Sequence, residues 1–344
     1  MPKVIKKEIN RIMNGLPKFF GGKRKFVKLI LAKSVGTTFA DGFLGGGSVA
    51  LYAKVQGFSV LCNDISFLSE QIGRAYIENN SMKLDNDDIN RLFVPAESRS
   101  NFILKHYAPN TFTTRHAKFF DNARFWIEKT NNPTRRNLLY CFLAKFILDV
   151  RPYGNFSTTY LSELAEQLDR CPADKIPEHS MIKSVSTIFT TPIYFYALKV
   201  MEKVNQSVLT NGKRNYFFRK DIFDFVDEID ADTLYLDPPY TGAASYEDYY
   251  GVLNSCLKGC KIKSEKSVFN KEDGFKFLDK LLSKCGKFKR LILSFGCEKY
   301  TVKEIYDLFL KYRPNAELLE IPSYYSVGVK DGKTPVKTEI LLIG

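Results

Sequence analysis

The segment that most constrains the fold runs from a strand through a glycine-rich turn and a helix into a second strand, over residues 37–66. TTFADGFLGGGSVALYAKVQG is apolar on both sides of its glycines, and FSVLCNDIS follows with the character of a second strand. A unit of this length predicts parallel strands joined by a crossover helix. The alternation resumes after residue 190, with helices between strands expected near 215–221, 232–240, 289–296, 317–327 and 338–344. We therefore predict an α/β fold with a mainly parallel sheet and helices on both faces.

The region between these two parts has a different pattern. Residues 67–187 are expected to be mostly helical and irregular, with aromatic and basic residues interleaved, as in RHAKFFDNARFWIEK. Strands and helices do not alternate there. We therefore predict one domain built from residues 1–66 and 188–344, and a second domain, residues 67–187, inserted into it.

The chain is strongly basic, with a formal net charge of +13 over 344 residues. Ten of the first 34 residues are Lys or Arg, and a single one, Glu8, is acidic. This excess favours a polyanionic partner over a basic surface that only contacts water. No apolar stretch approaches the roughly 18 residues of a membrane helix. The N-terminal segment lacks the apolar core of a signal peptide, so we expect a cytoplasmic protein.

Cysteine and histidine are scattered rather than paired. The seven cysteines are an odd number at irregular spacings, which does not indicate a disulfide framework. The close pair Cys256 and Cys260 has no second pair to complete a zinc site, and the chain holds three histidines. We therefore expect no bound metal.

The glycine turn predicts a ligand site. Gly45 and Gly47 stand where a strand turns into a helix, so the backbone can approach a ligand at the helix N-terminus. About 20 residues on, Asp64 ends the next strand and can accept hydrogen bonds from ribose hydroxyls. Gly45, Gly47 and Ala50 also fit the loose pattern G-x-G-x-x-A. The turn alone leaves open a dinucleotide, another adenosine-bearing ligand or a turn without a ligand.

A carboxylate and two prolines end a later strand in LYLDPPYTG, residues 234–242. The prolines fix φ and remove backbone donors. Pro238 also biases Asp237 toward an extended backbone. The arrangement holds the Asp237 carboxylate, the proline carbonyls and the Tyr240 ring in a set relation, which favours a functional site over a core position.

Taken in order, these motifs resemble the Dam-like, alpha-group (D12 class) DNA adenine-N6 methyltransferases. The resemblance covers roughly residues 15–66 and 190–344. PKFFGGKRKF is similar to the family's cofactor motif, with Phe19 where a tryptophan is usual, DPPY matches its catalytic motif, and KTEILLIG is similar to its closing Glu-containing strand. The resemblance implies a Rossmann-like sheet, S-adenosylmethionine (SAM) as cofactor and an inserted target-recognition domain. Asp237 argues against the related protein glutamine methyltransferases, which typically carry Asn there.

The resemblance also implies roles for individual residues. Asp237 and the Pro238 carbonyl would accept hydrogen bonds from the adenine N6 amine, and Tyr240 would stack on the flipped-out base. Lys23 would approach the cofactor's methionine carboxylate. The catalytic set is Asp237, Pro238, Pro239 and Tyr240. The cofactor-binding set is Phe19, Lys23, Phe43, Gly45, Gly47, Asp64, Asp221, Ile222 and Asp237, with Asp221 and the Ile222 backbone N–H beside the adenine of the cofactor.

The expected partner is double-stranded DNA, bound by a monomer. The candidate contacts are Arg115, Lys118, Arg124, Arg151, Asn155 and Tyr249. Arg151 and Asn155 suit bidentate base readout, or they hold a turn at PYG. The target sequence is not predicted, and a partner restriction endonuclease and a solitary role stay open. RNA adenine methylation, and a basic nucleic-acid-binding protein on an inactive methyltransferase scaffold, are the alternatives.

Overall fold

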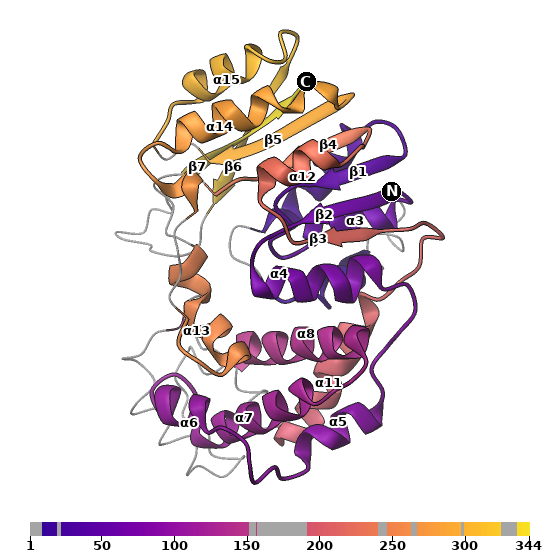
Figure 1. The fold of residues 1–344 in the computed structure, drawn as a ribbon, viewed down its shortest axis with the longest axis vertical. Coiled ribbons are helices and arrows are strands. Elements are labelled where there is room, and N and C mark those ends of the chain that lie inside the picture. Colours follow the sequence, from indigo (N-terminus) through magenta and orange to yellow (C-terminus); the bar gives the residue numbers. More distant parts are fainter. Residues whose placement is uncertain are drawn as a thin grey trace. The chain divides into compact units, whose positions relative to one another are not determined.

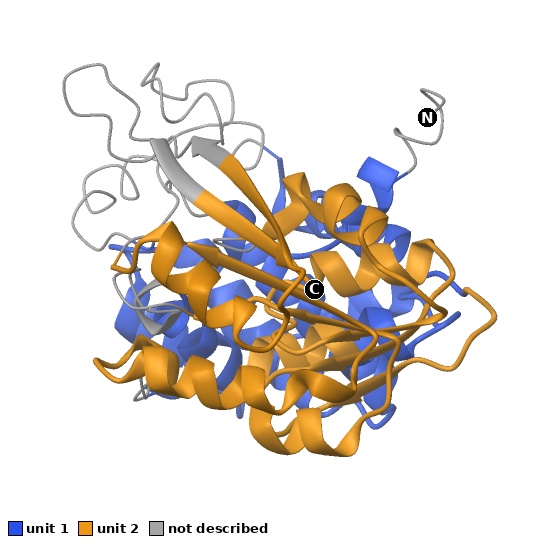
Figure 2. Ribbon diagram, turned by 90° about the horizontal axis from the view of Figure 1, so that it is seen from above, with its two compact units in different colours: residues 1–20, 74–210, 249–263 blue, residues 21–73, 211–248, 264–344 orange. Residues whose placement is uncertain are grey.

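The computed structural model describes residues 9–18, 22–150, 156, 191–239, 246–262, 267–296, 299–324 and 336–344. The side chains of residues 246–249, 322–324 and 336–338 lie outside this description. The chain divides into two compact units (Figure 2). The sheet unit consists of residues 21–73, 211–248 and 264–344, and the helical unit of residues 1–20, 74–210 and 249–263.

The sheet unit contains a seven-stranded sheet in the order β3-β2-β1-β4-β5-β7-β6 (Figure 1). The neighbours from β3 to β5 are parallel, whereas β7 runs antiparallel to both β5 and β6. This confirms the predicted α/β class and the mainly parallel sheet. The strands are β1 Thr38–Asp41, β2 Ser59–Asn63, β3 Tyr216–Phe218, β4 Thr233–Leu236, β5 Arg290–Gly296, β6 Glu317–Tyr324 and β7 Val336–Ile343.

Both faces of the central strands are buried, as expected for a parallel sheet. One face packs against a core that includes residues of α12 (Ile222–Glu228), α14 (Gly274–Ser283) and α15 (Val302–Leu310), among them Phe225, Leu281 and Phe309. Alternate strand residues such as Phe39 and Tyr235 are buried outside this cluster, with their rings stacked 6.4 Å apart. Helix α3 (Ser48–Val55) contacts β1 and β2, and α2 (Val27–Ala32) contacts α3.

Short elements complete the sheet unit. They are η1 Lys23–Lys25, α4 Phe67–Ile72, η3 Val268–Asn270 and η4 Cys285–Lys287. The π-helical segment η2, Gly73–Glu78, follows α4 in sequence, and its residues from 74 onward belong to the helical unit. Helix α13, Tyr246–Lys258, follows the DPPY segment in sequence, and its residues from 249 onward belong to the helical unit. Apolar residues of α13 such as Tyr250, Leu253 and Leu257 are buried at helical spacing.

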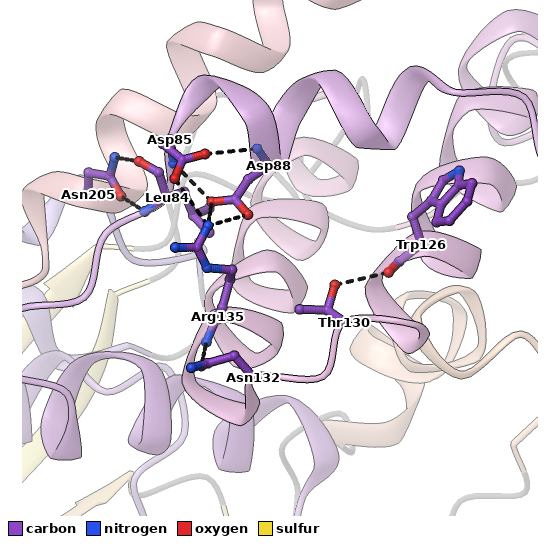
Figure 3. Close-up of polar contacts among 8 residues, drawn as sticks. All are labelled: Leu84, Asp85, Asp88, Trp126, Thr130, Asn132, Arg135 and Asn205. Carbon is purple, nitrogen blue, oxygen red and sulfur yellow. Dashed lines mark hydrogen bonds and ion pairs between the residues drawn. The ribbon is translucent and has the colours of Figure 1, made fainter.

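Polar side chains link several helices of the helical unit (Figure 3). These helices are α5 Asn86–Phe93, α6 Phe102–Tyr107, α7 Thr114–Glu128, α8 Pro133–Val150 and α11 Ile193–Gln206. Arg135 of α8 donates to Asp88 and to Asp85, which form the capping box of α5. Asn205 of α11 exchanges two hydrogen bonds of 2.8–2.9 Å with the Leu84 backbone. These contacts fix α5 against α8 and α11 without relying on apolar packing alone.

The helical unit overlaps the predicted insertion, but their bounds differ. It starts at residue 74 rather than 67, and it also takes in residues 1–20, 188–210 and 249–263. Its role in target recognition stays a prediction. Among the helices that the structure describes, none is long and apolar enough to cross a membrane.

Candidate active site

Three aspartates lie where parallel strands of the sheet unit end. Asp41 is the last residue of β1, Asp64 follows β2, and Asp237 follows β4. After β1 the chain moves outward to β2 and β3, and it then returns to place β4 and β5 on the other side of β1. The boundary between β1 and β4 is therefore the topological switch point, outside which open α/β sheets bind their ligands.

The glycine turn spans the ends of three strands at this edge. Gly42 N–H donates to the Tyr235 carbonyl of β4, at 2.9 Å, and Leu44 N–H to the Asn63 carbonyl of β2, also at 2.9 Å. Gly45 and Gly47 adopt positive φ values of 49° and 73°, a conformation that favours glycine. Gly47 is the N-cap residue of α3. The amides of Gly45 and Gly47 donate within the protein, to Asp64 and to the Leu44 carbonyl.

Asp64 holds this turn in place. Its carboxylate accepts from Gly45 N–H and Ser66 N–H, each at 2.8 Å. Burial raises the pKa of Asp64, and these hydrogen bonds oppose that rise. The next residue, Ile65, is an isoleucine with 66% of its surface exposed. An exposed apolar side chain beside a ribose-binding candidate is a feature that our sequence analysis did not single out.

Asn63 joins the end of β2 to the exit from β3. Its side chain donates to the Lys220 carbonyl at 3.1 Å and accepts from Lys220 N–H at 3.0 Å. The residue after Lys220 is Asp221, which caps α12 by accepting from Phe223 N–H at 2.9 Å. Ile222 is buried in the core of the sheet unit. The segment predicted to flank the cofactor adenine is therefore tied to the strand that precedes Asp64.

Asp237 forms an ion pair with a buried lysine. Lys23 Nζ lies 3.1 Å from Asp237 Oδ1 and 3.6 Å from Glu339 Oε2. The Lys23 side chain is 6% exposed, and that of Asp237 is 21% exposed. Pro238, directly after Asp237, is buried. The structure thus places Lys23 beside the predicted catalytic acid, and its approach to a cofactor carboxylate stays a prediction.

Acidic side chains gather at this edge, and burial favours their protonated forms. Asp41 is 1% exposed, and burial, with a smaller contribution from the nearby Asp237 charge, raises its pKa to about 8. Burial also raises the pKa of Asp237, while the Lys23 ammonium opposes that rise and Glu339 adds to it. Our sequence analysis quoted Asp41 and Glu339 inside motifs without giving either a role. The position of Asp41 at a strand end was the available signal.

Replacing Asp41 with asparagine is expected to stabilise the protein at alkaline pH. The pKa of Asp41 is higher in the folded protein than its ordinary value of 3.8, so wild-type stability is lost as pH rises toward about 8. Asparagine cannot ionise, and its side-chain oxygen can still accept from Phe43 N–H, as Asp41 Oδ1 does at 3.3 Å. We expect a gain of about 1–3 kcal/mol above pH 8 that shrinks on acidification.

Urea unfolding of the two proteins without cofactor, repeated across pH, measures this difference. Asp227→Asn is the matched control, because the Asp227 side chain is 53% exposed and pairs with Lys284. An Asp41→Asn protein less stable than wild type at alkaline pH would show that the buried carboxylate is not destabilising.

The remaining predicted cofactor and catalytic residues fall into two groups. The Phe43 ring packs edge-on against Phe269, with ring centroids 5.6 Å apart, so its side chain supports the turn. Pro239 is partly buried next to Pro238. Phe19 and Tyr240 lie outside the described residues. Among the described residues, no group of His, Cys, Asp and Glu is arranged to hold a metal ion.

The residues predicted to contact DNA differ in their exposure. Arg115 and Lys118 are exposed on α7. Arg124, on the same helix, is buried, pairs with Glu128 and packs against Gly259, where an added Cβ would lie 2.3 Å from the Arg124 Cζ atom. A phosphate contact by Arg124 would have to compete with this packing. Arg151 and Asn155 lie outside the described residues, as does the side chain of Tyr249 in α13.

The model of a known protein family matches most of the chain. The model of the D12 class N6 adenine-specific DNA methyltransferases aligns with residues 19–169 and 174–308. The chain belongs to this family. The match includes Lys23, the glycine turn, Asp64 and Asp237, and it leaves the β7 segment with Glu339 outside. Family membership confirms the resemblance read from the motifs and makes the protein an adenine-specific DNA methyltransferase.

Individual relatives agree with this family. Type II methyltransferase M2.HphI of Haemophilus parahaemolyticus is 28% identical over 309 residues, which cover 89% of this chain and 90% of the relative. Type II methyltransferase M.NlaIII of Neisseria lactamica is 25% identical over 80% of both chains. Modification methylase LlaI of Lactococcus lactis subsp. lactis is 24% identical over 83% of this chain and 47% of its own length.

Proposed function

We propose that this protein transfers a methyl group from SAM to the N6 atom of a flipped-out adenine in double-stranded DNA. The observation that carries the proposal is the Asp237 carboxylate, which follows β4 at the switch point, precedes two prolines and pairs with Lys23 at 3.1 Å. The family match supports the reaction class and the DNA substrate.

The residues at the strand ends suit SAM. The cofactor carries a positively charged sulfonium that supplies the methyl group, and it also carries an ammonium. Asp64 and Asp237 would offer carboxylates to these positive charges, and Lys23 balances the charge of Asp237 within the protein. The Asp64 carboxylate would accept from the ribose hydroxyls, and the positive-φ glycines would let the chain approach the ligand closely. The exposed Ile65 would offer an apolar contact to the adenine ring of the cofactor.

The chemistry asks the protein mainly to position and polarise the adenine amine. The lone pair of that amine is delocalised into the ring, so the amine is a poor nucleophile. Asp237 and the Pro238 carbonyl would accept its two N–H groups and draw the nitrogen toward tetrahedral geometry. Because the positive charge of the sulfonium disappears during transfer, in-line positioning and fixed electrostatics carry the reaction. Burial raises the pKa of Asp237, and the Lys23 ammonium counteracts this so that Asp237 can act as a carboxylate.

Access to N6 inside a duplex requires that the base leave the stack. Tyr240, directly after the two prolines, would stack on the extruded adenine. Such stacking contributes about 1–3 kcal/mol, which partly offsets the few kcal/mol of unstacking. The phenol ring, rather than its hydroxyl, is the functional part in this proposal.

Long-range attraction to DNA is assigned to exposed basic residues of α7. Replacing Arg115 and Lys118 together with glutamine should weaken binding across all sequences. It should also reduce the slope of log K against log salt by about 2, because each phosphate contact contributes about 0.9. Fluorescence anisotropy with labelled duplexes at several salt concentrations measures both quantities. Lys276→Gln with Lys303→Gln removes two highly exposed lysines of the sheet unit as a control. An unchanged slope in the α7 variant would remove these residues from the DNA-binding surface.

The function is tested by incubating purified protein with SAM and mixed-sequence DNA, followed by sequencing of methylated bases. We expect N6-methyladenine in one defined sequence context. Binding of DNA without methylation of any sequence would support the alternative of a basic binding protein on an inactive scaffold. Methylation of RNA in preference to DNA would show that the substrate is RNA and would leave the proposed methyl-transfer chemistry unchanged. The names of the type II and modification methylases support a role in DNA modification alongside a restriction endonuclease.

A further inference from the structure

Glu339 reaches the catalytic edge because its strand runs against the others. Parallel strands bring their carboxyl ends to one edge of the sheet, which is why Asp41 and Asp237 meet there. Strand β7 is antiparallel to β5, so its early residues lie at that same edge, and Glu339 pairs with Gly296, the last residue of β5. The Glu339 carboxylate then lies 3.6 Å from Lys23 Nζ.

Lys23 is thus shared between two carboxylates in a place with little solvent. The side chains of Lys23 and Glu339 are each 6% exposed. A buried ammonium needs a partner to remain charged. Asp237 provides one partner, at 3.1 Å, but in the proposed reaction this carboxylate must also accept from the adenine amine.

These two duties of Asp237 conflict. With no cation nearby, burial and the neighbouring acids would favour its protonated form, which accepts poorly. With a cation that pairs with Asp237 alone, the carboxylate would be ionised but engaged by the ammonium. A second anion within reach of the ammonium resolves the conflict, because it takes up part of the interaction with Lys23.

We propose that Glu339 is a positioning residue for methyl transfer. Lys23 keeps the Asp237 carboxylate ionised, and Glu339, by sharing Lys23, leaves that carboxylate able to accept from the substrate amine. This inference rests on the proposed function of Asp237. Glu339 itself touches no reacting atom in it and acts through Lys23.

The charged and titratable groups that face Asp237 come from several elements. Lys23 belongs to η1, Glu339 to β7 and Asp41 to β1. Burial raises the pKa of the Tyr235 phenol of β4, and the nearby acids raise it further. Lys23 lowers the pKa of Asp237, whereas Glu339 raises it. Removing the charge of Lys23 should therefore raise the pKa of Asp237, and removing the charge of Glu339 should lower it. A general loss of packing would not produce this pattern.

The direct test is a carbon-13 NMR titration of aspartate side chains in the free protein, with Asp237 assigned from an Asp237→Asn variant. Lys23→Met is expected to raise the pKa of Asp237 by about 1–3 units, and Glu339→Gln to lower it by about 1 unit. Glu339→Asp keeps the charge with a shorter reach and should fall between wild type and Glu339→Gln, which provides a second variant. Glu317→Gln is the matched control, because Glu317 pairs with Lys33 in a partly exposed contact outside the site.

Single-turnover methylation at saturating SAM and DNA provides the functional readout. In Glu339→Gln, Lys23 should interact more strongly with Asp237. We therefore expect the maximal single-turnover rate to fall about tenfold, and the acidic limb of the profile of rate against pH to move to lower pH. In Lys23→Met the acidic limb should move to higher pH. The affinity of Glu339→Gln for SAM should stay within about threefold of wild type, which separates positioning of Asp237 from cofactor binding.

The outcomes distinguish this inference from the function beneath it. Shifts in the same direction, or no shift in Glu339→Gln and Glu339→Asp, would overturn the positioning role even if the wild-type protein methylates DNA. Opposite shifts in a protein that methylates no nucleic acid would overturn the proposed function and leave the shared lysine established. Opposite shifts together with the expected loss of rate would support both.

Discussion

Asp237→Ala is expected to abolish detectable methyl transfer, a loss of about 1,000-fold or more. The substitution removes the carboxylate that would accept from the adenine amine, and it leaves the buried Lys23 with one carboxylate partner fewer. The measurement is incorporation of tritiated methyl groups into mixed-sequence DNA under single-turnover conditions with saturating SAM. Saturation matters because Asp237 also borders the predicted cofactor site.

Comparison variants make this result specific. Asp227→Ala, which removes a half-exposed carboxylate of the same sheet unit, should retain wild-type activity. Tyr240→Ala should lose less than Asp237→Ala, and Tyr240→Phe should keep most activity, because stacking needs the ring alone. Activity of Asp237→Ala within tenfold of wild type would refute the catalytic role assigned to this carboxylate.

Asp64→Ala is expected to weaken SAM binding by about 1–3 kcal/mol, or roughly 5- to 150-fold. Two effects contribute to this loss. The ribose hydroxyls lose their acceptor, and Gly45 N–H loses the carboxylate that holds the glycine turn, at 2.8 Å. Asp64→Asn keeps one acceptor oxygen and cannot serve Gly45 and Ser66 equally, so its affinity should lie between wild type and Asp64→Ala.

Isothermal titration calorimetry with SAM, and with its demethylated product, measures these affinities. Asp230→Ala, at an exposed position ahead of β4, is a control that should bind as wild type does. An unchanged affinity in Asp64→Ala would remove the ribose assignment. Tight binding of NAD in place of SAM would return the glycine turn to the dinucleotide alternative.

Local sequence patterns determined much of the sheet unit. Short apolar runs that end in Asn63-Asp64 and in Asp237 formed β2 and β4 as expected, because buried parallel strands need continuous apolar character. The glycine turn likewise has positive φ at Gly45 and Gly47, a conformation that glycine residues at a turn indicate. The order of these local features was enough to indicate the family that the comparison later matched.

Local patterns were less informative about the helical unit. The basic and aromatic residues of α7 were treated as one phosphate-binding group, yet Arg124 is buried beside Glu128 while Arg115 and Lys118 are exposed. Helical spacing gives the relative direction of side chains, but it does not say which face another helix covers. The neighbours of α7 and the close approach of Gly259 decided that.

The charges of the candidate active site depended on tertiary structure altogether. Lys23, Asp237 and Glu339 are each about 100 or more residues apart in sequence, and the antiparallel direction of β7 brings Glu339 to the edge where β4 ends. The sequence by itself determined which side chains could carry the chemistry and at which strand ends they would stand. Only the tertiary structure decided which of them form ion pairs and how strongly burial shifts their pKa values. The physical reason is that an electrostatic interaction depends on the distance between the charges and on the exclusion of water, and neither can be read from residue order.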